Sequence, residues 1–254
     1  MVMYSLERQD KILEILKEKK SVSVEKLMKL MYVSPATIRR DLSEMEKRGL
    51  VQRTFGGVVL RQGPGEESSY IYRETRNTKE KAHIAKLASE LITDNSSLFI
   101  DSSTTATFLV PFFRNYRRLT IITNSLNIAL MLGNQTSAEV FLTSGYLNAR
   151  SGSVMGWQTA NALTKTHTKY ALVSCSALNL QYGAMESTSD QSEVKLQMIR
   201  NCDCAILLAD AQKIGKNDLF QTVSLSSFKY IVTDKEPNQE FKDYCQENNV
   251  KILF

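Results

Sequence analysis

Apolar residues near the N-terminus recur every three or four positions in three short segments. The first runs from Ser5 to about Lys19, the second can be capped by Ser23, and the third begins at Ser34-Pro35. A serine hydroxyl can accept a bond from an early backbone N–H, and proline suits the first helical position. The apolar positions are Leu6, Ile12, Leu13, Ile15 and Leu16, then Leu27, Met28, Leu30 and Met31, and finally Ile38, Leu42 and Met45. This periodicity predicts three helices, with a tight turn at residues 32–33 before the third.

A hairpin signal follows the third helix. Gly49 permits the left-handed residue that often ends a helix. Two β-prone runs, 50–54 and 58–60, then flank Phe55-Gly56-Gly57, a pattern typical of a β-hairpin. Three helices and a hairpin predict a winged helix-turn-helix domain over residues 1–60.

The third helix has one apolar side and one polar side. Arg40 lies opposite the apolar residues, and Arg39 lies on a flank. The first turns of such a helix reach base edges in the major groove, where arginine can bond the O6 and N7 of guanine together. The same arginines could serve only phosphates, or form a solvated basic face. The candidate DNA-binding residues of helix and wing are Ser34, Ala36, Thr37, Arg39, Arg40, Ser43, Arg53, Phe55 and Gly57.

The charge distribution supports this interpretation. The net charge is +5, and all of the excess lies in residues 1–61, which hold 13 of the 32 Lys and Arg but only 8 of the 27 Asp and Glu. Localised positive charge supplies the salt-sensitive part of nucleic-acid binding. Residues 62–254 have no such bias.

The remaining chain alternates strand-length apolar runs with helical stretches. Residues 61–69 are rich in Gly, Pro and Ser, so we predict a linker over 61–76. Asn77 and Glu80 form a plausible capping pair for a helix that extends to Leu91. The apolar runs are 98–100, 119–122, 140–142, 171–173, 205–208, 230–232 and 250–254. Such alternation predicts the fold class α/β, with a mostly parallel sheet in a larger domain over 77–254.

Small polar residues follow several of these runs. In open α/β sheets ligands bind beyond the carboxyl ends of strands, and hydroxyls that open a helix favour an anion such as phosphate. A single such cluster is usually a helix cap, but its recurrence at several strand ends favours a binding site. Lys213 could bind a phosphate, and Asp210 and Asn124 could bind sugar hydroxyls, although Asp210 and Lys213 could equally form a surface pair. The roles of Glu193 and Lys195 are ambiguous, because these residues fit a solvated helix face as well as they fit a binding site. The candidate effector-binding residues are Asp101, Ser102, Ser103, Thr104, Thr105, Thr123, Asn124, Ser125, Gly145, Asp210 and Lys213.

Two motifs resemble the DeoR family of bacterial sugar-metabolism repressors. Residues 34–42 read Ser-Pro-Ala-Thr-Ile-Arg-Arg-Asp-Leu and residues 49–57 read Gly-Leu-Val-Gln-Arg-Thr-Phe-Gly-Gly, which is similar to the family's DNA-binding signature. The family's wing usually carries histidine where Phe55 stands. The resemblance implies that the chain binds DNA.

The second domain resembles the sensor domain of the same family, whose fold is related to that of ribose-5-phosphate isomerase. The family's Asp-Ser-Gly-Thr-Thr, Thr-Asn-Ser, Gly-Gly and Asp-x-x-Lys match residues 101–105, 123–125, 144–145 and 210–213. Ser103 and Ser144 replace family glycines and could narrow the pocket or move its backbone. Residues 174–179 lack the family's glycine-rich run.

The resemblance favours a repressor of carbohydrate-metabolism genes that is controlled by a phosphorylated sugar or related metabolite. Its partners would be double-stranded operator DNA and that effector. Paired half-sites imply a homo-oligomer, a dimer or higher. One alternative is a sugar-phosphate isomerase-like enzyme fused to a DNA-binding domain, but proton transfer needs a general base and residues 174–182 contain no acid. A non-specific architectural DNA binder fits poorly with a large neutral domain.

Other functional classes have little support. No apolar run approaches the roughly 18–20 residues of a membrane span, and the N-terminus leads into a charged helix, so we expect a cytoplasmic protein without membrane contact. Four cysteines and two histidines lack zinc-site spacing, so we expect no metal and no cofactor.

Overall fold

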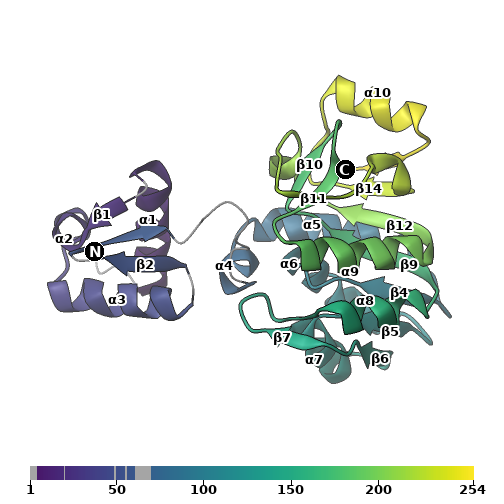
Figure 1. The fold of residues 1–254 in the computed structure, drawn as a ribbon, viewed down its shortest axis with the longest axis horizontal. Coiled ribbons are helices and arrows are strands. Elements are labelled where there is room, and N and C mark those ends of the chain that lie inside the picture. The colour runs from purple at the N-terminus through teal and green to yellow at the C-terminus, as the bar shows by residue number, and fades with distance from the viewer. Residues whose placement is uncertain (1–4, 20, 49, 55, 61–69) are drawn as a thin grey trace. The chain divides into compact units, whose positions relative to one another are not determined.

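The computed structural model describes residues 5–19, 21–48, 50–54, 56–60 and 70–254, which divide into two compact units (Figure 1). The first unit contains the N-terminal helices and hairpin together with Ile71–Arg73, and the second contains Tyr70 and Glu74–Phe254. The helix α4 (Tyr70–Glu74) falls within the linker predicted over 61–76, so that segment is partly helical. Gly49, Phe55 and residues 61–69 lie outside the described residues.

The N-terminal unit combines three helices with a three-stranded antiparallel sheet. Its elements are α1 (Ser5–Lys19), β1 (Ser21–Ser23), α2 (Val24–Met31), α3 (Pro35–Lys47), β2 (Val51–Thr54) and β3 (Gly57–Leu60). Strands β2 and β3 form the predicted hairpin, and β1 pairs with the other side of β3, which the sequence did not predict. The apolar periodicity identifies most of the core, except that Leu6 is 64% and Leu30 43% exposed.

A seven-stranded sheet organises the second unit, and every neighbouring pair in it is parallel. Its strands are β4 (Ser97–Ile100), β5 (Thr120–Thr123), β6 (Glu139–Leu142), β9 (Thr168–Ser174), β12 (Cys202–Leu208), β14 (Tyr230–Val232) and β15 (Lys251–Leu253). The order across the sheet is β15-β14-β12-β9-β4-β5-β6. Each predicted apolar run lies in or overlaps one strand. The central strands are buried on both faces, as in other parallel sheets, whereas the edge strand β6 is largely exposed. The predicted α/β class with a mostly parallel sheet is confirmed.

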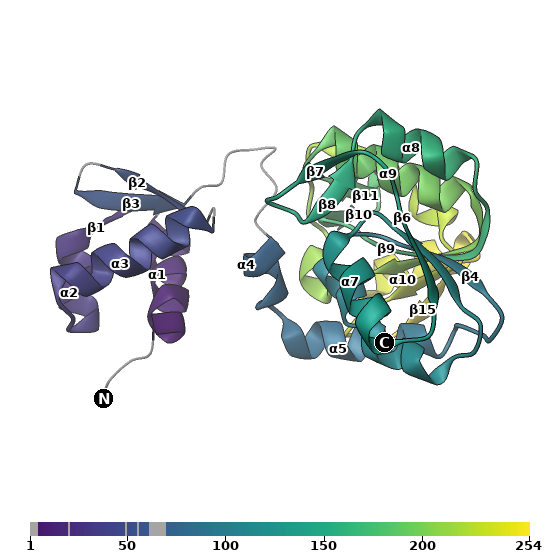
Figure 2. The same cartoon turned by 90° about the horizontal axis from the view of Figure 1, so that it is seen from below.

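Helices cover both faces of the sheet, which gives three layers (Figure 2). One face is covered by α5 (Thr78–Ser89), α6 (Thr104–Thr107), the 3-10 helix η1 (Val110–Asn115) and α7 (Leu126–Gln135). The other face is covered by α8 (Trp157–Thr164), α9 (Ser189–Arg200) and α10 (Gln239–Glu247). This arrangement leaves the carboxyl ends of the strands to the connecting loops, where the predicted effector residues lie.

Short antiparallel elements lie beside the main sheet, and the sequence did not predict them. They are the hairpin β7 (Tyr146–Asn148) and β8 (Ser153–Met155), and the small sheet of β10 (Ala177–Asn179), β11 (Gly183–Glu186) and β13 (Phe220–Val223). Two further 3-10 helices are η2 (Ala211–Lys213) and η3 (Leu225–Ser227).

The predicted start of α5 is wrong in its detail. Asn77 precedes the helix with φ +51° and its side chain makes no capping bond, so the expected Asn77–Glu80 capping pair does not form. The chain enters the helix through a left-handed residue, a conformation that asparagine tolerates. The helix ends at Ser89 rather than near Leu91. Among the described residues, no helix is long and apolar enough to cross a membrane, and no cluster could hold a metal ion.

Candidate DNA-binding face and effector site

The start of α3 has the predicted cap. Ser34 accepts a hydrogen bond from the Thr37 backbone N–H at 3.2 Å, and Pro35 is the first helical residue. The Ser34 and Thr37 hydroxyls also lie 2.9 Å apart, so both are held at the helix start. Tyr32 makes the preceding turn in the left-handed region, at φ +53°. The cap fixes which residues α3 presents first.

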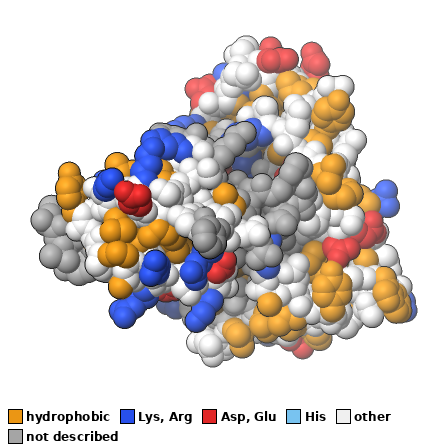
Figure 3. All heavy atoms as spheres, turned by 60° about the vertical axis from the view of Figure 1, so that its left-hand side comes forward, with side chains coloured by type: hydrophobic (Ala, Val, Ile, Leu, Met, Phe, Trp, Pro, Cys, Tyr) orange, Lys and Arg blue, Asp and Glu red, His pale blue; other side chains and the backbone are white. Residues whose placement is uncertain are grey.

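The polar side of α3 is exposed as predicted. Ala36, Arg39 and Arg40 are exposed, and Thr37 and Ser43 are half-buried, while Ile38, Leu42 and Met45 on the opposite side are buried. Figure 3 shows Lys and Arg side chains among hydrophobic and acidic ones on the face that is turned forward. Because Arg39 and Arg40 are exposed, the polar side of α3 can meet a polyanion.

The hairpin of β2 and β3, the predicted wing, is attached to α3 by a hydrogen bond from the wing's backbone to a side chain of α3. The Arg53 N–H donates to Glu46 Oε1 at 2.9 Å, and the Arg53 side chain is exposed. Gly57 has a packing reason to be glycine, because a Cβ there would lie 2.7 Å from the Val22 carbonyl oxygen.

A buried ion pair joins α1 to the recognition helix. Arg8 Nε donates to Asp41 Oδ2 at 2.7 Å, and Arg8 Nη2 donates to Asp41 Oδ1 at 3.1 Å. Ser5 Oγ donates to Asp41 Oδ1 at 2.7 Å. The hydrogen bonds to Asp41 and the charge of that carboxylate raise the pKa of the Arg8 guanidinium above its ordinary value. Asp41 is only 2% exposed, so the pair fixes α3 from its buried side, a role that the sequence did not reveal.

The ends of β4, β5 and β6 form a buried polar row. Ile100 is in register with Thr123, and Thr123 is in register with Leu142. The next residues along these parallel strands are Asp101, Asn124 and Thr143, which are 1%, 0% and 9% exposed. Each follows a register partner at the end of its strand, so these three residues lie next to one another at one edge of the sheet.

Asp101 is the charged member of this row and is fully engaged. Its Oδ1 accepts from the Ser103 N–H at 3.0 Å, and its Oδ2 accepts from the Ser174 N–H at 2.8 Å. Lys195 Nζ lies 3.3 Å from the same Oδ2 and also donates to Glu186. Burial lowers the pKa of Lys195, but the charges of Glu186 and Asp101 more than offset it and raise the pKa overall. Lys195 is therefore a charged, buried group between two carboxylates.

The sequence left the role of both residues open: a solvated helix face does not describe Lys195, which is 6% exposed, but it does describe Glu193, which is exposed. The sequence spacing alone gives no signal for this cluster, because Asp101, Glu186 and Lys195 come from three separate elements. Lys81 of α5 is also buried.

Lys213 lies at the ends of β9 and β12. Its Nζ donates to Ser174 Oγ at 2.9 Å, and that hydroxyl donates to the Leu208 carbonyl at 2.6 Å. The nearest Asp210 oxygen is 3.9 Å away, and Asp210 also accepts from the Gln212 N–H at 3.2 Å. Asp210 is 3% exposed, so the alternative of a surface pair does not describe it.

Several predicted hydroxyls serve as local caps. Ser103 accepts from the Ala106 N–H at 3.1 Å, Ser125 from the Ile128 N–H at 3.2 Å, and Thr123 from the Ser125 N–H at 3.0 Å. Ser103 has φ −73°, which any residue adopts, so serine strains no backbone in place of the family's glycine. The helix that it caps, α6, has only four residues, which weakens the expected contribution of its N-terminus to anion binding.

Some other polar side-chain atoms at these strand ends have no hydrogen-bond partner among the described residues. Asn124 Nδ2 donates to the Val154 carbonyl at 3.2 Å, but Asn124 Oδ1 and Thr143 Oγ1 are buried with no hydrogen-bond partner in the described part of the chain. The buried residues Thr104 and Thr105 likewise make no side-chain hydrogen bond to any described residue. Ser102 Oγ donates to Gln191 at 3.5 Å, and Gln191 donates to Ser153 at 3.3 Å, so α9 and β8 close over the row.

Gly145 has a backbone reason to be glycine. Its φ is +147°, and a Cβ would lie 2.3 Å from the Met155 carbonyl oxygen. The neighbouring Ser144 is exposed and its carbonyl accepts from Thr159 Oγ1 at 2.7 Å. The structure thus brings most of the predicted effector residues to one edge of the sheet, with Gly145 as a packing position beside them.

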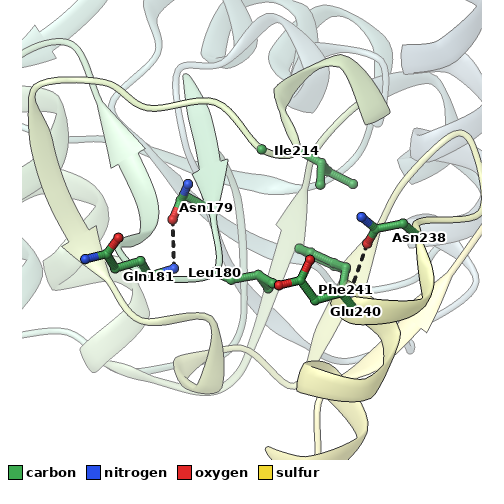
Figure 4. A pocket seen from close by; sticks show the side chains of 8 residues that line it. Asn179, Leu180, Gln181, Ile214, Asn238, Glu240 and Phe241 are labelled. Atoms are coloured by element: carbon green, nitrogen blue, oxygen red, sulfur yellow. Dashed lines mark hydrogen bonds between the residues drawn. The ribbon is translucent and has the colours of Figure 1, made fainter.

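A separate pocket of about 310 Å³ lies elsewhere on the second unit (Figure 4). It is lined by Asn179, Leu180, Gln181, Ile214, Gly215, Asn238, Glu240 and Phe241, none of them a predicted effector residue. Two of its amides have local structural roles: Asn179 Oδ1 accepts from the Gln181 N–H at 2.7 Å in a turn, and Asn238 Oδ1 caps α10 by accepting from the Phe241 N–H at 3.0 Å.

Comparison with known proteins now decides the family. Residues 8–62 match the DeoR-like helix-turn-helix domain, and residues 76–235 match the DeoR C terminal sensor domain. The chain is a DeoR-family transcriptional regulator. It is 32% identical to the HTH-type transcriptional repressor GlcR of Bacillus subtilis over 99% of this chain and 96% of that one. It is 28% identical to the glycerol-3-phosphate regulon repressor of Escherichia coli over 98% of this chain and 99% of that one.

These relatives are regulators and not enzymes, which confirms the expectation that this DeoR-family chain is a regulator rather than an isomerase-like enzyme. They include an activator, the L-fucose operon activator of Haemophilus influenzae, at 27% identity over 97% of this chain and 98% of that one. Among solved structures, ribose 5-phosphate isomerase A of Methanocaldococcus jannaschii has a TM-score of 0.40 at 14% identity, covering 54% of this chain and 55% of that one. A likeness at this level says nothing about activity.

Proposed function

We propose that this DNA-binding regulator represses carbohydrate-metabolism genes and that a phosphorylated sugar or related metabolite controls its operator affinity. The names of two relatives, a transcriptional repressor and a glycerol-3-phosphate regulon repressor, support the mode and the ligand class. The observation that carries the proposal is the row of buried polar residues Asp101, Asn124 and Thr143 at adjacent carboxyl ends of the sheet. Asn124 and Thr143 each leave one polar atom without a partner among the described residues. Buried polar groups without partners are rare unless something binds there.

The charges near this row suggest where a phosphate would bind. Lys195 is neutralised by two buried carboxylates, whereas the Asp210 carboxylate stays 3.9 Å from Lys213. We therefore assign the phosphate to Lys213 together with the hydroxyls of Thr104 and Thr105. Asn124 would accept a hydrogen bond from a sugar hydroxyl.

In this proposal residues 1–60 bind DNA, 61–76 link the domains, and 77–254 bind the effector. Arg39 and Arg40 reach the major groove, and Ser34, Ala36, Thr37, Ser43 and the wing position the helix. A homo-oligomer in the cytoplasm presents two such domains to repeated half-sites. The effector weakens operator binding only through a higher affinity for the arrangement that does not fit the operator.

The test combines thermal stability with operator titration. A ligand that binds only the folded state stabilises it by about 2.7 kcal/mol at 100 times its dissociation constant. We expect one phosphorylated sugar in a panel to raise the melting temperature and then to weaken binding of the operator upstream of a carbohydrate operon. Stabilisation without any change in operator affinity would refute control by that ligand, and tighter operator binding would refute repression relieved by it.

A further inference from the structure

We infer that Asn124 and Thr143 together form a subsite for a neutral hydroxyl group of the effector, and that Thr143 determines specificity there. This inference rests on the proposed function, since it describes one part of the same site. Thr143 was not among the residues that the sequence singled out for binding.

Position brings the two residues together. Thr123 and Leu142 are the last register partners of β5 and β6, and the Thr143 N–H donates to the Thr123 carbonyl at 3.0 Å as part of that pair. Asn124 and Thr143 are therefore the first residues beyond the ends of two adjacent strands, which run about 4.8 Å apart.

Burial makes their unpaired atoms significant. Asn124 is 0% and Thr143 9% exposed, and Asn124 Oδ1 and Thr143 Oγ1 have no hydrogen-bond partner among the described residues. The amide nitrogen of Asn124 is already held by the Val154 carbonyl at 3.2 Å, which directs the free oxygen away from that bond. An unsatisfied buried acceptor is costly, so a group that donates to it gains affinity that an apolar surface could not give.

The chemistry of the two atoms selects the ligand. Asn124 Oδ1 can only accept a hydrogen bond, whereas Thr143 Oγ1 can both donate and accept. A hydroxyl group satisfies both at once, because it donates to the amide oxygen and accepts from the threonine. A phosphate oxygen without a proton would face the lone pairs of Asn124 and be repelled. The subsite therefore takes a hydroxyl-bearing part of the effector and leaves the phosphate to the side of the site that holds Lys213.

The test uses three variants of the full chain and a ligand panel. Thr143→Val removes the hydroxyl and keeps the shape, and Thr143→Ser keeps the hydroxyl. Thr168→Val is the matched control, because Thr168 is a buried threonine whose hydroxyl donates to the Tyr170 carbonyl at 2.9 Å. The probes are ribose 5-phosphate, glucose 6-phosphate, glycerol 3-phosphate, the unphosphorylated sugars and inorganic phosphate.

Without ligand, we expect Thr143→Val to melt at or above the wild-type temperature and Thr168→Val to melt below it. With a phosphorylated sugar that stabilises the wild type, Thr143→Val should lose about tenfold in affinity. It should keep its response to inorganic phosphate, and Thr143→Ser should bind like the wild type. If Thr143 had a structural role instead, Thr143→Val would melt below the wild-type temperature in the absence of ligand.

Two results for the Thr143→Val variant would overturn the subsite. One is a melting temperature for Thr143→Val as low as that of Thr168→Val, and the other is full affinity of Thr143→Val for the sugar. If an unphosphorylated sugar alone stabilises the wild type and Thr143→Val loses that effect, the subsite stands and the proposed phosphate effector fails. If no probe stabilises the wild type, both are refuted.

Discussion

Replacing Asp41 by alanine should unfold the DNA-binding unit while leaving the second unit folded. The change removes the acceptor of two bonds from Arg8 and one from Ser5, and it takes the Asp41 carboxylate away from a buried arginine. Breaking a buried ion pair at one partner costs about 3–5 kcal/mol. A unit of roughly 55 residues has a total stability of about 3–8 kcal/mol. The loss is thus comparable with the whole stability of the unit.

Calorimetry of the full chain can measure this, because two compact units can give two transitions. For Asp41→Ala we expect the transition of the DNA-binding unit to fall or vanish, operator binding to be lost, and the other transition to stay. Lys29→Ala is the matched control, since Lys29 forms an exposed pair with Glu25 at 2.9 Å and its removal should cost no more than about 0.5 kcal/mol.

A double variant separates charge from packing. Arg8→Met with Asp41→Leu removes both charges and fills similar volume, so it should recover most of the lost stability. A loss below about 1 kcal/mol for Asp41→Ala would refute the assigned role of the ion pair. If the double variant does not recover the lost stability, the orientation of the hydrogen bonds, and not the charge left on Arg8, dominates the loss of stability in Asp41→Ala.

Three further predictions concern recognition and response. Arg40→Ala should cost about 1–3 kcal/mol on the operator and much less on random DNA in a binding titration, and equal losses would reduce Arg40 to a phosphate contact. Lys213→Ala should weaken the effector response while operator binding without ligand stays the same, so a full response would remove Lys213 from the site. Tyr70 donates to Thr107 at 2.9 Å, since the Thr107 hydroxyl itself donates to the Ser103 carbonyl at 3.2 Å. Tyr70 belongs to α4, within the predicted linker, and this bond ties it to the second unit. Tyr70→Phe should keep effector affinity but reduce the effector's influence on operator affinity. Tyr116→Phe, which loses a bond to the Ser89 carbonyl, should leave that influence unchanged.

Local signals in the sequence were sufficient for much of the fold. The cap at Ser34 depends on residues three positions apart, and apolar runs such as 205–208 are continuous because their strands are buried on both faces. The placement of Asp101 and Asn124 at one edge followed from the rule that parallel strands end together. These features need no knowledge of distant contacts.

Long-range pairing was beyond the same signals. Lys195 and Glu193 lie two positions apart on one helix, yet one is buried and the other exposed, because Asp101 and Glu186 meet only Lys195. The cap expected from Asn77 failed because the chain enters α5 in a left-handed conformation, which composition does not reveal. The strands β7 and β8 have only three residues each, and β7 is largely exposed, so the hairpin lacks a continuous apolar run.

The edge of the sheet divides into an ionic half, with Asp101, Lys195 and Lys213, and a neutral half, with Asn124 and Thr143. Substitution of Asp101 or Lys195 strands a buried charge, whereas exchanging one neutral side chain for another of similar size is far less costly. Mutational tolerance should therefore concentrate at the ends of β5 and β6. New sugar preferences can evolve, or be engineered, at those two strand ends while the ionic half is inherited unchanged.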